Sequence, residues 1–330
     1  MRLIQMRHRS GERRVGLIED EQIFLVEGAS SIFALAQQAS AAGASLARVV
    51  QSHATSDTLD YDTLYGGDSE WKILPAIDHP EPSRCMVSGT GLTHLASARK
   101  RQSMHAAGEA PTDSMRMYQW GVEGGRPAPG RIGTPPEWFF KGTGACLRAH
   151  GEQLTAPPHA EDCGEEPEIA GVYLVDAAGL PRRIGMAAGN EFSDHRIEKK
   201  NYLYLAASKL MPCAIGPELI VEPEFGLVRG EVSIERGGEA LWSRDIVSGE
   251  AVMCHSLANL EHHHFKHEAH RRPGDLHVHF FGADAFSFGE GIALRDGDVM
   301  QVRFAGFGRP LRNRLRIDSG APRVFTAAPL

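Results

Sequence analysis

Short apolar runs separated by turns dominate the first part of the chain. Three such runs occupy residues 2–6, 15–18 and 23–26, with a turn at Ser10-Gly11, a pattern typical of a strand meander. Apolar residues then recur at nearly helical spacing across 31–51, although Gly43 weakens the middle. This pattern predicts strands followed by a helical segment.

A change in composition follows. Residues 66–83 are rich in Gly, Asp and Pro, so we place a domain boundary near residue 80. Residues 95–136 are polar, rich in Gly and Pro, and lack a clear period. A segment of that length in a compact chain is usually functional. We predict a lid over an active site, with Arg99-Lys100-Arg101 as its solvated surface; a surface insertion is the alternative.

Beyond residue 138, apolar runs and turns alternate again. The pattern predicts at least six strands and two helices, at about 195–209 and 253–268. There is no regular strand–helix–strand repeat, so the fold class is α+β, mostly β. We expect a small N-terminal α/β domain at 1–80 and a larger domain at 81–330.

Composition excludes several classes of function. The chain has 330 residues with a formal net charge of −7, which argues against nucleic acid or an anionic membrane as its main partner. No phosphate-binding glycine loop is present. The five cysteines form no CxxC pair, no apolar run reaches 18 residues, and the N-terminus lacks an apolar signal segment. We therefore predict a soluble cytoplasmic protein.

An acidic run, EDCGEEPE at 161–168, leads directly into a predicted strand. In a strand Glu166 and Glu168 would point to one face about 7 Å apart. Two carboxylates that close repel each other unless a cation lies between them. Burial at the start of a strand would make an unpaired charge costly. A cation site is therefore predicted, with a solvated acidic loop as the alternative.

A second segment, GNEFSDHR at 189–196, follows the next predicted strand. Glu191 would sit at the strand end, where a third carboxylate could reach the first two. Ser193 is a candidate N-cap for the next helix. Lys209 lies at the far end of that helix, where a solvated lysine is the ordinary alternative.

These segments together resemble the fumarylacetoacetate hydrolase family over roughly residues 80–320. The resemblance implies a mixed β-sandwich roll with a small N-terminal domain, a divalent metal, and a homodimer. The segments that carry it are Gly89–His94, Phe139–Gly142, Glu166 with Glu168, Asn190–Ser193, Lys209, Ile215–Pro217, Pro273–Asp275, Asp296–Val299, and Gly306–Gly308 with Asn313.

The chain departs from the family pattern at two positions. The third metal ligand of the family is Asp, whereas this chain has Glu191, with Asp194 as an alternative ligand. Hydrolases of the family carry a Glu three residues after the His, but here Ser97 follows His94 at that spacing. An imidazole without an orienting carboxylate is a weaker base, so hydrolysis of a carbon–carbon bond is disfavoured.

Residues 136–143, with the change at position 97, most resemble the sugar-acid dehydratases of that family. The resemblance implies a metal-dependent lyase that removes water from a 2-keto-3-deoxy-pentonate and gives 2,5-dioxopentanoate. One alternative is a hydrolase of 2,4-diketo acids of the acylpyruvate type. The other is a sugar-acid-binding protein without catalysis.

The predicted metal ligands are Glu166, Glu168 and Glu191. Carboxylate oxygens suit Mg²⁺, with Mn²⁺ as the alternative. They leave positions on the cation for a 2-keto acid substrate, whose enolate the cation would stabilise.

Other residues are predicted to act on the substrate. Lys209 would be the base or the partner of the enolate. Glu137 would be the acid or base at the carbon-4 hydroxyl, unless it is a solvated loop carboxylate. His94 would bond the substrate or close the lid. Lys141 would contact the substrate carboxylate, with a structural role as the alternative. The predicted substrate-binding residues are Lys141, Thr143, Gly89 and Thr90.

Histidines cluster at 262–270 (HHHFKHEAH). His263, His267 and His270 would share one face of a helix, which is a candidate zinc stripe; a polar helix face is the ordinary alternative. His277 and His279 alternate along a predicted strand, where they could face the active-site cleft.

Overall fold

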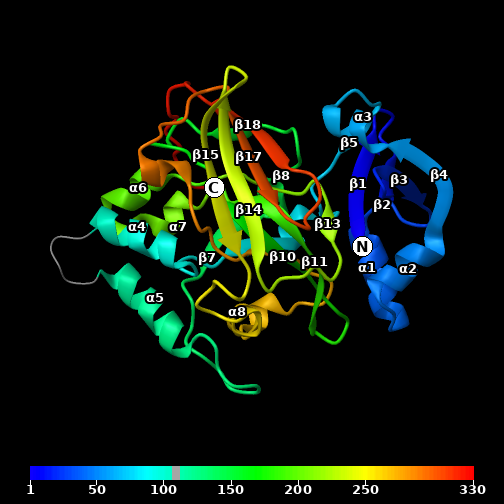
Figure 1. Cartoon of the computed structure of the whole chain (residues 1–330), viewed down its shortest axis with the longest axis horizontal. Helices are drawn as coiled ribbons and strands as arrows, with labels where there is room; N and C mark the ends of the chain where they lie inside the picture. The colour runs from blue at the N-terminus through cyan, green and yellow to red at the C-terminus, as the bar shows by residue number, and fades with distance from the viewer. Residues whose placement is uncertain (106–111) are drawn as a thin grey trace.

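The computed structural model describes residues 1–105 and 112–330, and of residues 100, 101 and 103–105 it describes only the backbone. Two β-sheets with a few helices around them make up the molecule (Figure 1). Most neighbouring strands are antiparallel; β16–β6, β12–β8 and β18–β9 are the parallel pairs. The predicted α+β, mostly β, fold class is confirmed.

The larger sheet has 13 strands. In the order of their hydrogen bonds they are β4 (Ala54–Asp60), β3 (Gln22–Val26), β2 (Arg13–Glu19), β1 (Arg2–His8), β13 (Leu219–Ile220), β11 (Pro181–Asn190), β10 (Pro167–Val175), β16 (Leu276–Phe280), β6 (Cys85–Gly89) and β7 (Phe139–Thr143), with β5 (Trp71–Ile73) on β1, β12 (Cys213–Ile215) on β11, and β8 (Leu147–Arg148) on β12.

The smaller sheet has five strands. They are β15 (Glu239–Ser248), β14 (Val228–Arg236), β17 (Val299–Phe304), β18 (Leu311–Ile317) and β9 (Leu154–Ala156). The α-helices are α1 (Ile32–Ala42), α2 (Leu46–His53), α3 (Tyr61–Gly66), α4 (Leu95–His105), α5 (Asp113–Gly124), α6 (His195–Lys200), α7 (Leu205–Ser208) and α8 (Leu257–Phe265).

Strand β10 lies at the centre of this arrangement, and all nine of its residues are buried. Its side chains alternate between two hydrophobic cores, as the two-residue period of a strand requires. Val172 and Leu174 pack in the core that contains α1 and α2, whereas Ile169 and Tyr173 pack in the core formed with the smaller sheet. The strand is thus held rigidly from both faces.

The N-terminal elements lie together on one side of the molecule (Figure 1). They share the larger sheet with the rest of the chain, because Leu3 of β1 pairs with Leu219 of β13. They also share a hydrophobic core with β10, β11 and β16. The division into domains at residue 80 stays a prediction.

Two helical predictions need correction. The segment 31–51 contains two helices, because Gly43 adopts a left-handed conformation that ends α1 and Ser45 caps α2. The predicted helix at 195–209 is divided into α6, the 3-10 turn Tyr202–Tyr204 and α7, since Asn201 is extended.

The predicted lid contains structure that its composition did not reveal. Helix α4 begins at its start, and α5 lies within it, capped by the Thr112 side chain, which accepts a hydrogen bond from Met115 N. Residues 106–111 lie outside the part of the chain that the structure describes, as do the side chains of Lys100 and Arg101. The closing of this segment as a lid stays a prediction. In the described residues, no helix is long and apolar enough to cross a membrane.

The zinc stripe predicted for the histidine cluster is wrong. Helix α8 ends at Phe265, so His263, His267 and His270 do not share one helix face. His267 is exposed, whereas His264 and His270 are buried. His264 Nε2 lies 3.0 Å from His277 Nδ1, so these rings bond to each other.

His279 is also buried, on β16. Its Nδ1 lies 2.9 Å from Ser88 Oγ and its Nε2 lies 2.7 Å from Thr90 Oγ1. Both ring nitrogens therefore contact β6 and the residue that follows it, so the ring is packed within the protein. Burial lowers the pKa of His277 and His279 to about 3.

These buried histidines predict a loss of stability in acid. In the unfolded chain a histidine titrates near pH 6.5, so below that pH the unfolded state binds a proton that folded His279 refuses. The stabilising contribution of the neutral ring is complete above pH 6.5 and falls as the pH drops toward 3. We expect a loss of about 1.4 kcal/mol per pH unit from this one group.

The measurement compares urea unfolding of the wild type and His279→Gln between pH 7.5 and 5. The difference in unfolding free energy should shift toward the variant as the pH falls, whatever constant offset the lost contacts cause. A difference that stays flat over this range would show that His279 titrates normally in the folded protein.

Candidate active site

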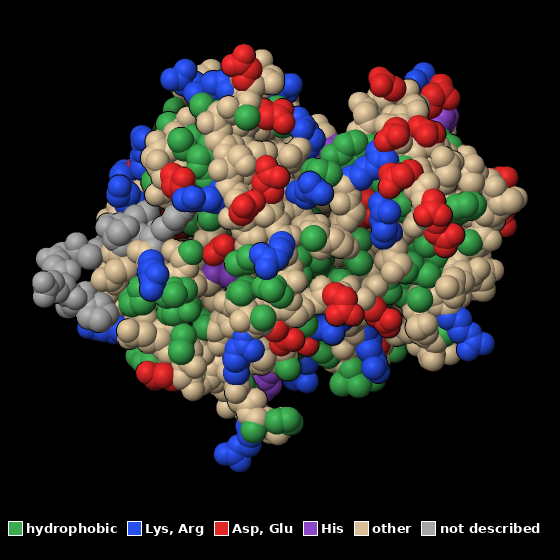
Figure 2. Space-filling view, in the orientation of Figure 1, with side chains coloured by type: hydrophobic (Ala, Val, Ile, Leu, Met, Phe, Trp, Pro, Cys, Tyr) green, Lys and Arg blue, Asp and Glu red, His purple; other side chains and the backbone are tan. Residues whose placement is uncertain are grey.

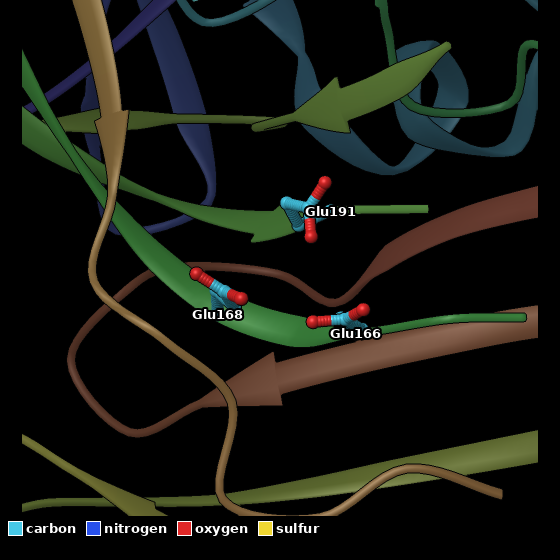
Figure 3. A group of neighbouring side chains, drawn as sticks. All are labelled: Glu166, Glu168 and Glu191. Atoms are coloured by element: carbon cyan, nitrogen blue, oxygen red, sulfur yellow. The ribbon is translucent and has the colours of Figure 1, made fainter. Parts of the chain in front are cut away.

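Three buried glutamates meet at the edge shared by β10 and β11. Glu166 precedes β10, Glu168 is its second residue, and Glu191 follows β11. Pro167 pairs with Asn190 in this antiparallel ladder, which brings the start of one strand beside the end of the other. One carboxylate oxygen from each glutamate lies within 4.8 Å of the others, and Figure 3 shows the three side chains gathered on these two strand ends.

Lys209 lies directly against this group. Its Nζ is 2.5 Å from Glu166 Oε1, 2.5 Å from Glu191 Oε2 and 3.1 Å from Ser193 Oγ. The side chain is buried. Burial lowers the pKa of Lys209, but the charges of Glu166 and Glu191 outweigh it and raise the pKa above the ordinary lysine value. The solvated-lysine alternative is therefore wrong.

Lys141, on β7, supports the same group from another side. Its Nζ lies 2.7 Å from Glu191 Oε1 and donates to the main-chain oxygens of Phe192 and Lys209. An ammonium group has three hydrogens to donate, and here all three have acceptors. The structure thus favours the structural alternative for Lys141 over a contact with the substrate.

The electrostatics of the group favour a cation. Burial raises the pKa of Glu166, but Lys209 and His195 outweigh it and lower the pKa well below its usual range. Burial and the charges of Glu191 and Glu166 raise the pKa of Glu168 well above its usual range. Three carboxylates thus face two ammonium groups, and Glu168 has no cationic partner among the described residues. A divalent cation would relieve this repulsion, and hard oxygen donors are the ligands Mg²⁺ prefers.

Two expectations about the segment after Glu191 are wrong. Asp194, not Ser193, caps α6, and its Oδ1 accepts a hydrogen bond from Ile197 N. Asp194 Oδ2 accepts from Glu161 N, so both oxygens are committed to the main chain and Asp194 does not join the carboxylate group. Ser193 Oγ instead donates to the Glu191 carboxylate.

Glu137 lies just before β7. It is buried, and its Oε2 accepts a hydrogen bond of 2.6 Å from the Tyr202 hydroxyl. The alternative of a solvated loop carboxylate is therefore wrong.

His94 is buried too. Its Nδ1 is 2.9 Å from Thr93 Oγ1, and its Nε2 has no hydrogen-bond partner among the described residues. Burial lowers the pKa of His94 to about 4, so the ring is neutral near pH 7. Ser97, in the position of the hydrolases' glutamate, donates to the main-chain oxygen of His94. The ring is thus oriented by a hydroxyl rather than by a carboxylate.

The remaining predicted substrate-binding residues lie on β6 and β7 or directly after them. A Cβ at Gly89 would lie 2.4 Å from the Phe139 ring, so a glycine is required there. That ring also lies 4.8 Å from Lys209 Nζ. Thr90 is buried and bonds His279, as described above, whereas Thr143 is half-buried at the end of β7. Their contacts with a substrate stay predictions.

Sequence reasoning missed three contacts of the site. His195 bonds Glu166 at 3.0 Å, Tyr202 bonds Glu137, and Gly282 N donates to Glu168 Oε2 at 2.6 Å. His195 lies four residues after Glu191, within a segment already singled out, so a hydrogen-bonding partner for the carboxylates could have been sought there. Nothing in the sequence marks Tyr202 or Gly282.

Comparison with known proteins gives relatives of one kind. No family model matches the chain. It is 27% identical over 183 residues to a probable 2-keto-3-deoxyxylonate dehydratase of Haloferax volcanii, covering 52% of this chain and 58% of the relative. It is 28% identical over 171 residues to 2-dehydro-3-deoxy-D-arabinonate dehydratase of Saccharolobus solfataricus, covering 51% and 50%. The matches thus span about half the length of these curated relatives.

Solved structures match over nearly the whole chain. A 2-keto-3-deoxy-D-arabinonate dehydratase complexed with magnesium and 2,5-dioxopentanoate has a TM-score of 0.71 at 20% identity, covering 97% of this chain and 100% of that one. A 5-carboxymethyl-2-hydroxymuconate delta-isomerase of Mycobacterium smegmatis has a TM-score of 0.56 at 17% identity, covering 96% and 99%. The chain therefore has the fold of these enzymes, and the resemblance of its motifs to the sugar-acid dehydratase branch of the fumarylacetoacetate hydrolase family is confirmed.

Proposed function

We propose that this protein is a Mg²⁺-dependent hydro-lyase that converts a 2-keto-3-deoxy-pentonate into 2,5-dioxopentanoate. The observation that carries the proposal is the buried group of Glu166, Glu168 and Glu191 with Lys209 bonded to two of its members. The named relatives are dehydratases of this substrate class. A structural neighbour binds magnesium together with the proposed product.

Glu166, Glu168 and Glu191 would hold the cation. Their oxygens are close enough to share one ion, and the cationic counterpart that Glu168 lacks among the described residues is what such an ion supplies. When bound, Mg²⁺ polarises the substrate's keto oxygen and stabilises the negative charge that develops there as carbon 3 loses its proton. Mn²⁺ is the alternative ion.

Lys209 is the proposed residue at carbon 3. A positive charge next to its ammonium group would lower its pKa and free its amine to accept the carbon-3 proton. If it keeps its proton, the same group faces the enolate as a counter-charge. Both roles need Lys209 at the carboxylate group, which is where the structure has it.

Glu137 is the proposed acid that protonates the hydroxyl leaving from carbon 4. Its carboxyl group is buried and held by Tyr202, so it is fixed in place. Loss of the carbon-3 proton and the carbon-4 hydroxyl removes one water. The remaining carbon-5 alcohol then becomes the aldehyde by moving hydrogen along the chain, without an oxidant.

The other proposed features support the same reaction. His94 would bond the substrate through the nitrogen that has no partner in the described structure, under a lid formed by residues 95–136. Thr143, Gly89 and Thr90 would line the substrate site. We further propose a homodimer in the cytoplasm, with residues 81–330 as the catalytic domain.

The hydroxyl-oriented His94 argues against the hydrolase alternative. Activation of water by a histidine relies on a carboxylate that orients the ring and stabilises its positive form. Here the ring contacts Thr93 and is kept neutral by burial.

The proposed function predicts a substrate profile. Purified protein with Mg²⁺ should release 2,5-dioxopentanoate from 2-keto-3-deoxy-pentonate, as followed by NMR, and excess EDTA should stop turnover. A panel of six-carbon 2-keto-3-deoxy acids and 2,4-diketo acids serves as the comparison. Cleavage of a diketo acid without dehydration would favour the hydrolase. Binding of the sugar acid without turnover would favour a binding protein.

A second prediction concerns Glu137. Glu137→Gln should lower kcat by about 10²–10⁴-fold, because general acid catalysis contributes that much. Binding of Mn²⁺, measured by electron paramagnetic resonance, should not change. Glu70→Gln, at an exposed carboxylate, is the matched control and should keep full activity. Undiminished turnover in Glu137→Gln would remove Glu137 from the mechanism.

A further inference from the structure

His195 contacts the carboxylate group but has no place in the proposed reaction. It is the first residue of α6 and is buried. Its Nε2 lies 3.0 Å from Glu166 Oε1. An ionised carboxylate can only accept, so Nε2 carries the hydrogen and donates it. The inference below rests on the proposed metal site.

The surroundings of the ring fix its orientation. Phe286 stacks on it at 4.7 Å with an interplanar angle of 7°, and Phe288 at 5.1 Å with 25°. Gly164 lies at the ring edge, where a Cβ would be only 2.7 Å from Nδ1. The start of α6 is held by the Asp194 cap. The ring is therefore preorganised, and its donor points at Glu166 without further ordering.

The two oxygens of Glu166 have different partners. Oε1 accepts hydrogen bonds from both Lys209 and His195. Among the described residues, no hydrogen-bond donor contacts Oε2. His195 thus commits one oxygen to the protein from a direction different from that of the lysine, which stops the carboxylate from rotating. The second oxygen is left to bind a cation.

We propose that His195 is a positioning residue that orients Glu166 for the metal and does not touch the substrate. Partners that hold metal-binding carboxylates in place commonly change metal affinity by about 10–100-fold when removed. Removing this donor should therefore weaken metal binding in that range. At saturating metal, kcat should fall much less than the affinity does.

The test measures Mn²⁺ binding to the full chain by electron paramagnetic resonance, with no substrate present. His195→Phe keeps an aromatic ring for the stack on Phe286 and Phe288 but cannot donate. We expect its Kd for Mn²⁺ to rise about 10–100-fold. His195→Gln keeps an N–H donor and should recover part of the affinity. His150→Phe is the matched control, because His150 also stacks on an aromatic ring, that of Tyr65 at 4.1 Å, and is not part of the carboxylate site.

Each outcome bears on a different claim. Wild-type Mn²⁺ affinity in His195→Phe would overturn the positioning role and leave the proposed function intact. Absence of Mn²⁺ binding in the wild type would instead overturn the proposed function. If His195→Phe does not fold, as judged by its Tm, His195→Gln decides the question. A folded His195→Gln variant with an activity loss that excess metal does not rescue would also contradict the proposal.

Discussion

Mutual repulsion between three buried carboxylates is the constraint on which the site depends. Glu166, Glu168 and Glu191 are brought together by two paired strand ends, and charges of one sign at that distance in a protein interior are costly. Lys209 and Lys141 offset part of this cost by bonding Glu166 and Glu191. The remainder favours a cation, and that cation site is the basis of the chemistry proposed here.

The fold holds these groups in place through its most buried elements. Strand β10 is packed against hydrophobic side chains on both faces, so the glutamates at its start have a rigid base. β16 ends beside them and supplies the main-chain donor of Gly282 to Glu168. β7 carries Lys141 and Phe139 toward Lys209. Rigid strands thus supply the metal ligands, whereas the residues that would act on carbon 4 and on the substrate come from segments flanking β6 and β7.

The sequence predicted the parts of the site that depend on local pattern. Glu166, Glu168 and Glu191 lie at strand ends, and a two-residue period with like charges is enough to mark them. It did not predict the partners that come from tertiary packing: His195 meets Glu166 only because α6 folds back over the start of β10, and Tyr202 meets Glu137 across 65 residues of chain. The helices α4 and α5 were missed because their apolar spacing is weak and the Thr112 cap was not read as a helix start. The zinc stripe failed because nothing in the spacing of histidines shows that α8 ends at Phe265.

The central claim is that the three carboxylates bind one divalent cation. It is tested most directly by crystals of the protein grown with Mn²⁺ and measured by anomalous diffraction. The account predicts a single strong peak bonded to one oxygen of each of Glu166, Glu168 and Glu191, and its loss in Glu168→Gln. A peak elsewhere, or no peak at the carboxylates at millimolar Mn²⁺ while Lys209 keeps both of its carboxylate bonds, would contradict it.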